Sequence, residues 1–169
     1  MDNKRKKIKY YSQNGEDFLM WKLFDYIDTG FYIEVGAFDG IHFSNTYSFE
    51  KLGWKGICIE PHPKFFPYCK KNRPGSICLN VACVGYDSAE EIGLLSGMSI
   101  DDDDIKDRYS KRKLNFQGFE KTKVKAQTLT NILDKHCLNQ TIDFISIDVE
   151  GTELDVLEGL DFDRYSPGQ

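Results

Sequence analysis

The chain has 169 residues, of which 40% are hydrophobic and 14% aromatic, so it is long and apolar enough to fold around a buried core and is not disordered. Its net charge of −5 argues against nucleic acid as the partner, because phosphate binding needs a basic surface. No apolar run approaches the roughly 18 residues of a membrane span. The basic start of the chain lacks an apolar segment behind it, which excludes a secretory signal and predicts a flexible tail over residues 1–10.

Cysteine usage favours a reducing compartment, and we therefore place the protein in the cytoplasm. The five cysteines form no C-x-x-C pair, and their odd number argues against a full disulfide framework. Neither pattern favours a zinc site. The sequence thus predicts buried free thiols at Cys58, Cys69, Cys78, Cys83 and Cys137.

Apolar periodicity predicts helices and strands in alternation along residues 11–169, which we interpret as one domain. In chain order the predicted elements are helix 14–27, strand 31–35, helix 44–52, strand 56–59, helix 64–71, strand 76–84, helix 128–138, strand 142–149 and helix 152–160. Such alternation predicts an α/β fold with a doubly wound, mostly parallel sheet of the Rossmann-like kind. Sheets of this kind usually continue further, so we expect a minimal version or one truncated at its C-terminal strands.

A segment of different character interrupts this alternation at about residues 86–125. It contains the run Asp101-Asp102-Asp103-Asp104, followed by Lys106, Arg108, Lys111, Arg112 and Lys113. Its periodicity is weak and its charge is mixed. We interpret it as an insertion, partly a short strand pair near 92–95 and partly a mobile lid that selects the substrate.

The first motif that indicates chemistry follows strand 31–35 and reads Glu34-Val35-Gly36-Ala37-Phe38-Asp39-Gly40. A strand that enters a tight glycine turn lets the backbone approach a ligand closely. Phe38 stands where the dinucleotide fingerprint has its second glycine, which leaves little room for a pyrophosphate. Acidic residues at Glu34 and Asp39 suit a ligand that carries an ammonium and a sulfonium charge.

Acidic residues also follow the second and the last predicted strands. Glu60, with Pro61 behind it, ends strand 56–59, where a carboxylate can accept both ribose hydroxyls of an adenosine. Asp148 and Glu150 end strand 142–149 and, as alternate residues of a strand, are predicted to point to the same side. They could hold a substrate hydroxyl, act as general base or bind a divalent cation. His42, just past the glycine loop, is the second candidate for the base.

These motifs together resemble the FkbM family of methyltransferases over about residues 11–160. The matching pieces are Ser12-Gln13-Asn14-Gly15-Glu16-Asp17, Glu34 to Gly40 with Ser44-Asn45-Thr46, Glu60-Pro61, and Ile147 to Glu153. The resemblance implies a class I fold that binds S-adenosylmethionine and an O-methyltransferase that often acts on a sugar or glycan hydroxyl. It also implies that Glu34, Gly36 and Asp39 contact the cofactor, that Glu60 binds its ribose, and that Ala82 lies near the adenine. We add Ala37, Pro61 and Asp148 to the cofactor-binding set, and Asp148, Glu150 and His42 form the catalytic set.

Other functions remain open at this point. The chain could be an adenosylmethionine-binding module of a larger protein without turnover of its own. Phe38 argues against a nicotinamide or nucleotide-sugar oxidoreductase. A methyltransferase that acts on the amino groups of nucleic-acid bases is also disfavoured, because the chain has no Asp-Pro-Pro-Tyr-like segment. A small molecule or a glycan is the expected partner, while metal dependence and oligomeric state stay undetermined.

Overall fold

The computed structural model describes residues 8–24, 27–86, 91–95, 121–137 and 140–167. Most of the predicted basic tail and the central part of the predicted lid lie outside these residues.

The main sheet is parallel and has the strand order β3-β2-β1-β7. Strand β1 (Phe31–Val35) lies at its centre, between β2 (Lys55–Ile59) and β7 (Phe144–Ile147), and β3 (Ile77–Leu79) lies outside β2. The chain thus leaves β1 toward one side of the sheet and returns on its other side. This order confirms the predicted α/β fold with a Rossmann-like parallel sheet.

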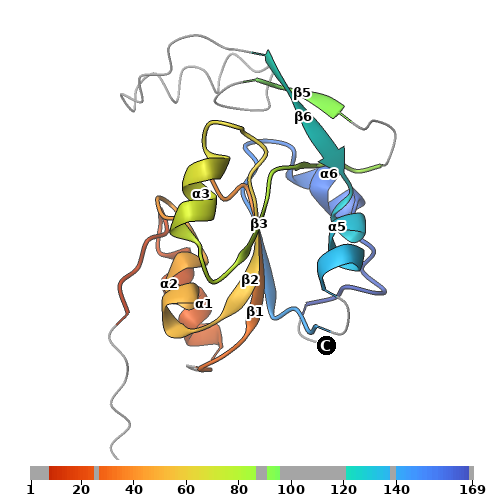
Figure 1. Cartoon of the computed structure of the whole chain (residues 1–169). Coiled ribbons are helices and arrows are strands. Elements are labelled where there is room, and N and C mark those ends of the chain that lie inside the picture. Colours follow the sequence, from red (N-terminus) through yellow and green to blue (C-terminus); the bar gives the residue numbers. More distant parts are fainter. Residues whose placement is uncertain (1–7, 25–26, 87–90, 96–120, 138–139, 168–169) are drawn as a thin grey trace, which may run out of the picture.

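Helices cover both faces of this sheet, as Figure 1 shows. Helices α1 (Glu16–Leu23), α2 (Tyr47–Leu52) and α3 (Phe66–Asn72) lie on one face, and α5 (Leu129–His136) and α6 (Glu153–Glu158) lie on the other. Successive residues of β1 point to opposite faces, so each face has its own core. Ile33 and Val35 pack against residues of α5 and α6, whereas Tyr32 packs against the aromatic side chains near α1 and α2.

A second, small sheet corrects the predicted strand 76–84 and the interpretation of residues 121–125 as part of an insertion without a strand. The predicted strand 76–84 is divided into β3 and β4 (Ala82–Cys83), and β4 joins β6 (Lys121–Gln127) and β5 (Glu91–Leu95) in the order β4-β6-β5. The break falls at Asn80 and Val81, where the side-chain amide of Asn80 donates to the backbone oxygens of Glu60 and Pro61.

Strand β6 was missed because its lysines alternate with the small or apolar residues Thr122, Val124 and Ala126, and the segment reads as a charged insertion. In the structure Val124 and Ala126 are buried while Lys123 and Lys125 are exposed, the pattern of a strand with one covered face. Its antiparallel partner is β5, so a strand near residues 92–95 is confirmed with a pairing partner distant in sequence.

No helix within the described ranges is long and apolar enough to cross a membrane.

Candidate functional site

The carboxyl ends of β1, β2 and β7 meet at a tight turn formed by Gly36. This glycine has φ 88°, and a Cβ atom placed on it would lie 1.9 Å from the carbonyl oxygen of Asp148. The amides of Gly36 and Ala37 both donate to the oxygen of Ile59, at 2.9 and 3.0 Å. Because glycine has no side chain, the backbones that follow β1 and β7 can approach closely here, and no other residue fits at position 36. The turn lies where the chain reverses the strand order, the place at which such sheets bind ligands.

Glu60 is buried behind this turn and holds it in place. Its Oε2 accepts the backbone N–H of Phe38 at 2.7 Å, and its Oε1 accepts that of His62 at 2.8 Å. Burial raises the pKa of Glu60 to about 7, although both hydrogen bonds act in the opposite direction. Phe38 has φ 50°, an uncommon backbone conformation for a non-glycine residue, and its bond to Glu60 helps to hold it there. Each carboxylate oxygen keeps a further lone pair, so the predicted contact with a ribose is compatible with this geometry.

Aromatic rings gather beside the Glu60 carboxylate. The rings of Phe38 and Phe65 lie 4.4 Å apart between centroids, and those of His62 and Phe65 lie 4.9 Å apart. Pro61 links this group to β3, because its carbonyl oxygen accepts a hydrogen bond from Asn80. The loops after β1 and β2 therefore place tilted aromatic rings near the turn that Glu60 holds.

Asp39 and His42 form a pair at the outer end of the loop. The Oδ2 atom of Asp39 lies 2.6 Å from Nδ1 of His42, and its Oδ1 accepts the backbone amides of Ile41 and His42, both at 2.9 Å. Burial acts to raise the pKa of Asp39, but these hydrogen bonds outweigh it and lower the pKa. The His42 side chain is 70% exposed. A carboxylate thus orients the ring of a largely exposed histidine.

Asp148 and Glu150 lie beyond the end of β7, which corrects the predicted strand 142–149. The strand ends at Ile147, and Glu150 has φ 61°, so the alternation of a strand does not govern where these two side chains point. Burial, followed by the negative charges of Glu150 and Glu153, raises the pKa of Asp148. Asp148 therefore attracts a proton more strongly than an isolated aspartate.

Glu34 points away from this edge, into the layer between the sheet and the helices. Its Oε1 accepts from the Ser44 hydroxyl at 2.7 Å and from the backbone N–H of Asn45 at 3.0 Å. Its Oε2 accepts from the Thr46 hydroxyl at 2.8 Å and from Arg73 at 2.9 Å. In this position Glu34 supports the loop from behind, and its contact with a cofactor stays a prediction.

Arg73 is the functional-site neighbour that the sequence did not reveal. It is fully buried, and besides Glu34 it donates to Oε2 of Glu50 at 2.9 Å, to the hydroxyl of Tyr32 at 2.7 Å and to the carbonyl oxygen of Gly40 at 3.2 Å. It follows a predicted helix as a single arginine, with no motif around it. Arg73 thus ties α3 to both ends of the glycine loop.

Two further motif residues are placed by the structure. Asp17 is fully buried and accepts hydrogen bonds from the hydroxyls of Ser12 and Ser48, while Ser12 forms an isolated bridge with Phe43. The N-terminal motif therefore closes the far end of the loop region. Ala82 is buried in β4, opposite Ala126 of β6, so the segment predicted to lie near the adenine belongs to the small sheet.

Comparison with known protein families agrees with this geometry. The model of the methyltransferase FkbM domain matches residues 34–168, which include the glycine loop, Glu60 and the acids after β7. Neither the curated proteins nor the solved structures contain a match to this chain. The chain belongs to the FkbM family of methyltransferase domains.

Proposed function

We propose that this chain transfers a methyl group from S-adenosylmethionine to a hydroxyl oxygen of a sugar or glycan. The observation that carries the proposal is the Gly36 turn, where two strand ends approach so closely that a Cβ atom would lie 1.9 Å from a backbone oxygen. Around that turn lie Glu60, Asp39 and Asp148, acids at the carboxyl edge of the sheet.

The residues around the turn fit adenosylmethionine. The cofactor carries ammonium and sulfonium charges and no phosphate, and this edge offers carboxylates rather than a glycine-rich phosphate cradle. Glu60 would accept the ribose hydroxyls, and the rings of Phe38 and Phe65 supply an apolar surface of the kind on which a purine packs. When bound, the cofactor supplies an activated methyl group.

The acids and His42 would serve the hydroxyl that receives the methyl group. A hydroxyl is a weak nucleophile, so a nearby base that accepts its proton speeds the transfer. Asp148 is our first candidate together with Glu150, because its raised pKa makes its carboxylate a better proton acceptor. The Asp39–His42 pair is the second, since the carboxylate holds Nδ1 and leaves Nε2 open.

A divalent cation held by the same acids is the alternative to a base. Within the described ranges, Asp148 and Glu150 are not joined by a third acid, histidine or cysteine into a compact set of ligands. We favour proton transfer to these side chains because burial and the neighbouring negative charges raise the pKa of Asp148. Turnover that is the same whether Mg²⁺ or Ca²⁺, the cations that prefer carboxylate ligands, is added or withheld is the expected result.

Binding of the demethylated cofactor, measured by calorimetry between pH 5.5 and 8.5, tests the cofactor site. Ribose hydroxyls donate to the ionised form of Glu60, so affinity should rise with pH up to about 7 and then level off. Glu60→Gln should remove this dependence. Glu158→Gln, on the exposed face of α6, is the matched control and should retain it.

Transfer from labelled adenosylmethionine to a panel of sugars and glycans tests the reaction. Asp148→Asn or Glu150→Gln should reduce turnover by about 100-fold or more, the usual contribution of a positioned base, while cofactor binding survives in at least one of them. Full activity in both variants would exclude these acids as the base. Cofactor binding without turnover on any acceptor would instead favour a binding module within a larger protein.

A further inference from the structure

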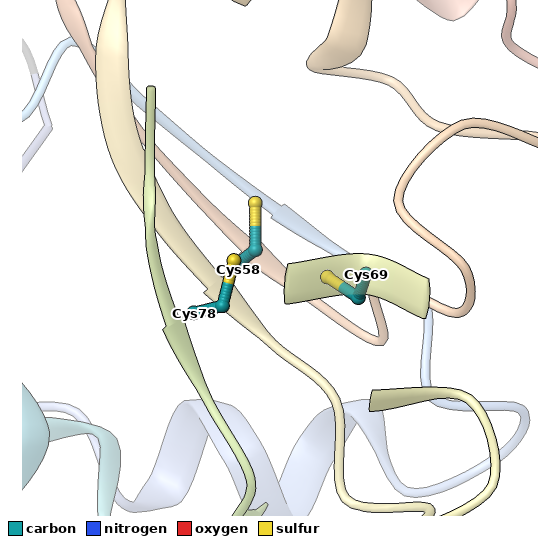
Figure 2. A group of neighbouring side chains, drawn as sticks. All are labelled: Cys58, Cys69 and Cys78. Carbon is teal, nitrogen blue, oxygen red and sulfur yellow. The ribbon is translucent and has the colours of Figure 1, made fainter. Parts of the chain in front are cut away.

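Three of the five cysteines gather in one cluster between the sheet and α3. Cys58 comes from β2, Cys69 from α3 and Cys78 from β3, and their sulfur atoms all lie within 4.8 Å of one another. Figure 2 shows the three side chains brought together from these elements. All three are free thiols.

The register of the sheet explains why they meet. Cys58 and Cys78 are direct partners in the parallel pairing of β2 and β3, so they share one face of the sheet. This face is covered by α3, whose inner side presents the buried Cys69. No C-x-x-C spacing announces the cluster, because each residue comes from a different element.

Three convergent thiols form the preferred ligand set of a soft cation. A zinc–sulfur bond is about 2.3 Å, which places three sulfurs around one ion about 4 Å apart. The sulfurs of the cluster are within 4.8 Å of one another, so a shift of less than about 1 Å would close them around an ion.

Cys58 and Cys69 belong to the aromatic core on this face of the sheet, but polar atoms also lie beside the cluster. The sulfur of Cys58 lies 3.9 Å from Oε2 of Glu34, and that of Cys78 lies 3.8 Å from the carbonyl oxygen of Arg73. Cys78 is half-buried, so an ion can reach the cluster from its side.

We propose that Cys58, Cys69 and Cys78 bind one divalent thiophilic cation of the zinc class, which joins α3 to β2 and β3. The site lies directly behind the glycine loop. The Cα atom of Cys69 is 3.2 Å from the position that a Cβ atom on Gly40 would take, and Arg73, one helical turn further, donates to the Gly40 carbonyl oxygen. Metal binding therefore strengthens the support of the proposed cofactor loop, and it is independent of which substrate the loop serves.

Titration of the reduced, metal-free chain with Cd²⁺ tests the site, because cadmium thiolates have a distinct near-ultraviolet absorption. We expect the band to saturate at one ion per chain and Zn²⁺ to displace it. Cys78→Ser changes the most accessible ligand and should weaken Cd²⁺ binding by about 10–100-fold or more, because changing even a residue that only supports a ligand costs that much. Cys83→Ser, a half-buried cysteine outside the cluster, is the matched control and should bind as the natural chain does.

Alkylation of the unaltered chain gives a second measurement that does not depend on whether a variant folds. Stoichiometric Cd²⁺ should slow the reaction of Cys78 with iodoacetamide at least 10-fold, as resolved by peptide mass spectrometry, and leave Cys83 unchanged. Absence of the absorption band, equal affinity of the two variants, or equal protection of Cys78 and Cys83 would each overturn the proposal.

Discussion

Glu60→Gln separates the electrostatic effect of the buried Glu60 carboxyl from its hydrogen bonds. Burial raises its pKa from 4.5 to about 7, which corresponds to about 3 kcal/mol of folding free energy. Because the folded chain holds this proton more tightly than the unfolded chain, the contribution is present below pH 4.5 and is lost as the pH rises through 7. Glutamine has one acceptor oxygen, so either Phe38 or His62 loses its partner, at a pH-independent cost of about 1–3 kcal/mol.

Urea unfolding of both chains between pH 4.5 and 8 measures the two effects. The natural chain should be the more stable at pH 4.5, and its advantage should shrink by up to about 3 kcal/mol by pH 8. Glu158→Gln removes the same charge from an exposed position and should leave the pH profile of the natural chain intact. A stability difference between the natural chain and Glu60→Gln that is equal at both pH values would refute the reasoning.

Three other substitutions test the frame of the site, each by urea unfolding. Gly36→Ala adds a Cβ atom 1.9 Å from a carbonyl oxygen and should lower the free energy of unfolding by well over about 2 kcal/mol. Gly15→Ala, also at positive φ but with nothing within 4 Å, should lower it by only about 1–2 kcal/mol. Equal losses in the two variants would contradict the close approach at Gly36. Arg73→Met leaves two buried carboxylates without their cation and should cost about 3–5 kcal/mol, unlike Arg164→Met in an exposed pair, which should change stability little; similar losses would contradict a buried network. Thr128→Ala removes the hydroxyl that accepts the Asn131 amide at the start of α5 and should cost about 1 kcal/mol, so no loss would contradict this cap.

The order of the main elements could be predicted from the sequence because apolar runs and glycine turns are local signals. Strand 31–35 is confirmed to the residue, and the predicted strands 56–59 and 142–149 lie within two residues of β2 and β7, whereas the predicted strand 76–84 covers both β3 and β4. The glycine loop, Glu60 and the acids after the last strand could be identified for the same reason, since each follows directly on a buried strand. Parallel strands then bring their carboxyl ends to one edge.

The tertiary structure alone decided which face each side chain uses and which distant segments pair. The glycine-loop motif predicts that Glu34 contacts a ligand, but the pleat of β1 directs its side chain inward to Arg73, a residue 39 positions away. Strand β6 lies between β4 and β5, and only this pairing shows that its alternating lysines form the exposed face of a strand. The cysteine cluster depends on the pairing of Cys58 with Cys78 and on the packing of α3 above them. Such contacts join residues far apart along the chain, and local sequence patterns carry no signal for them.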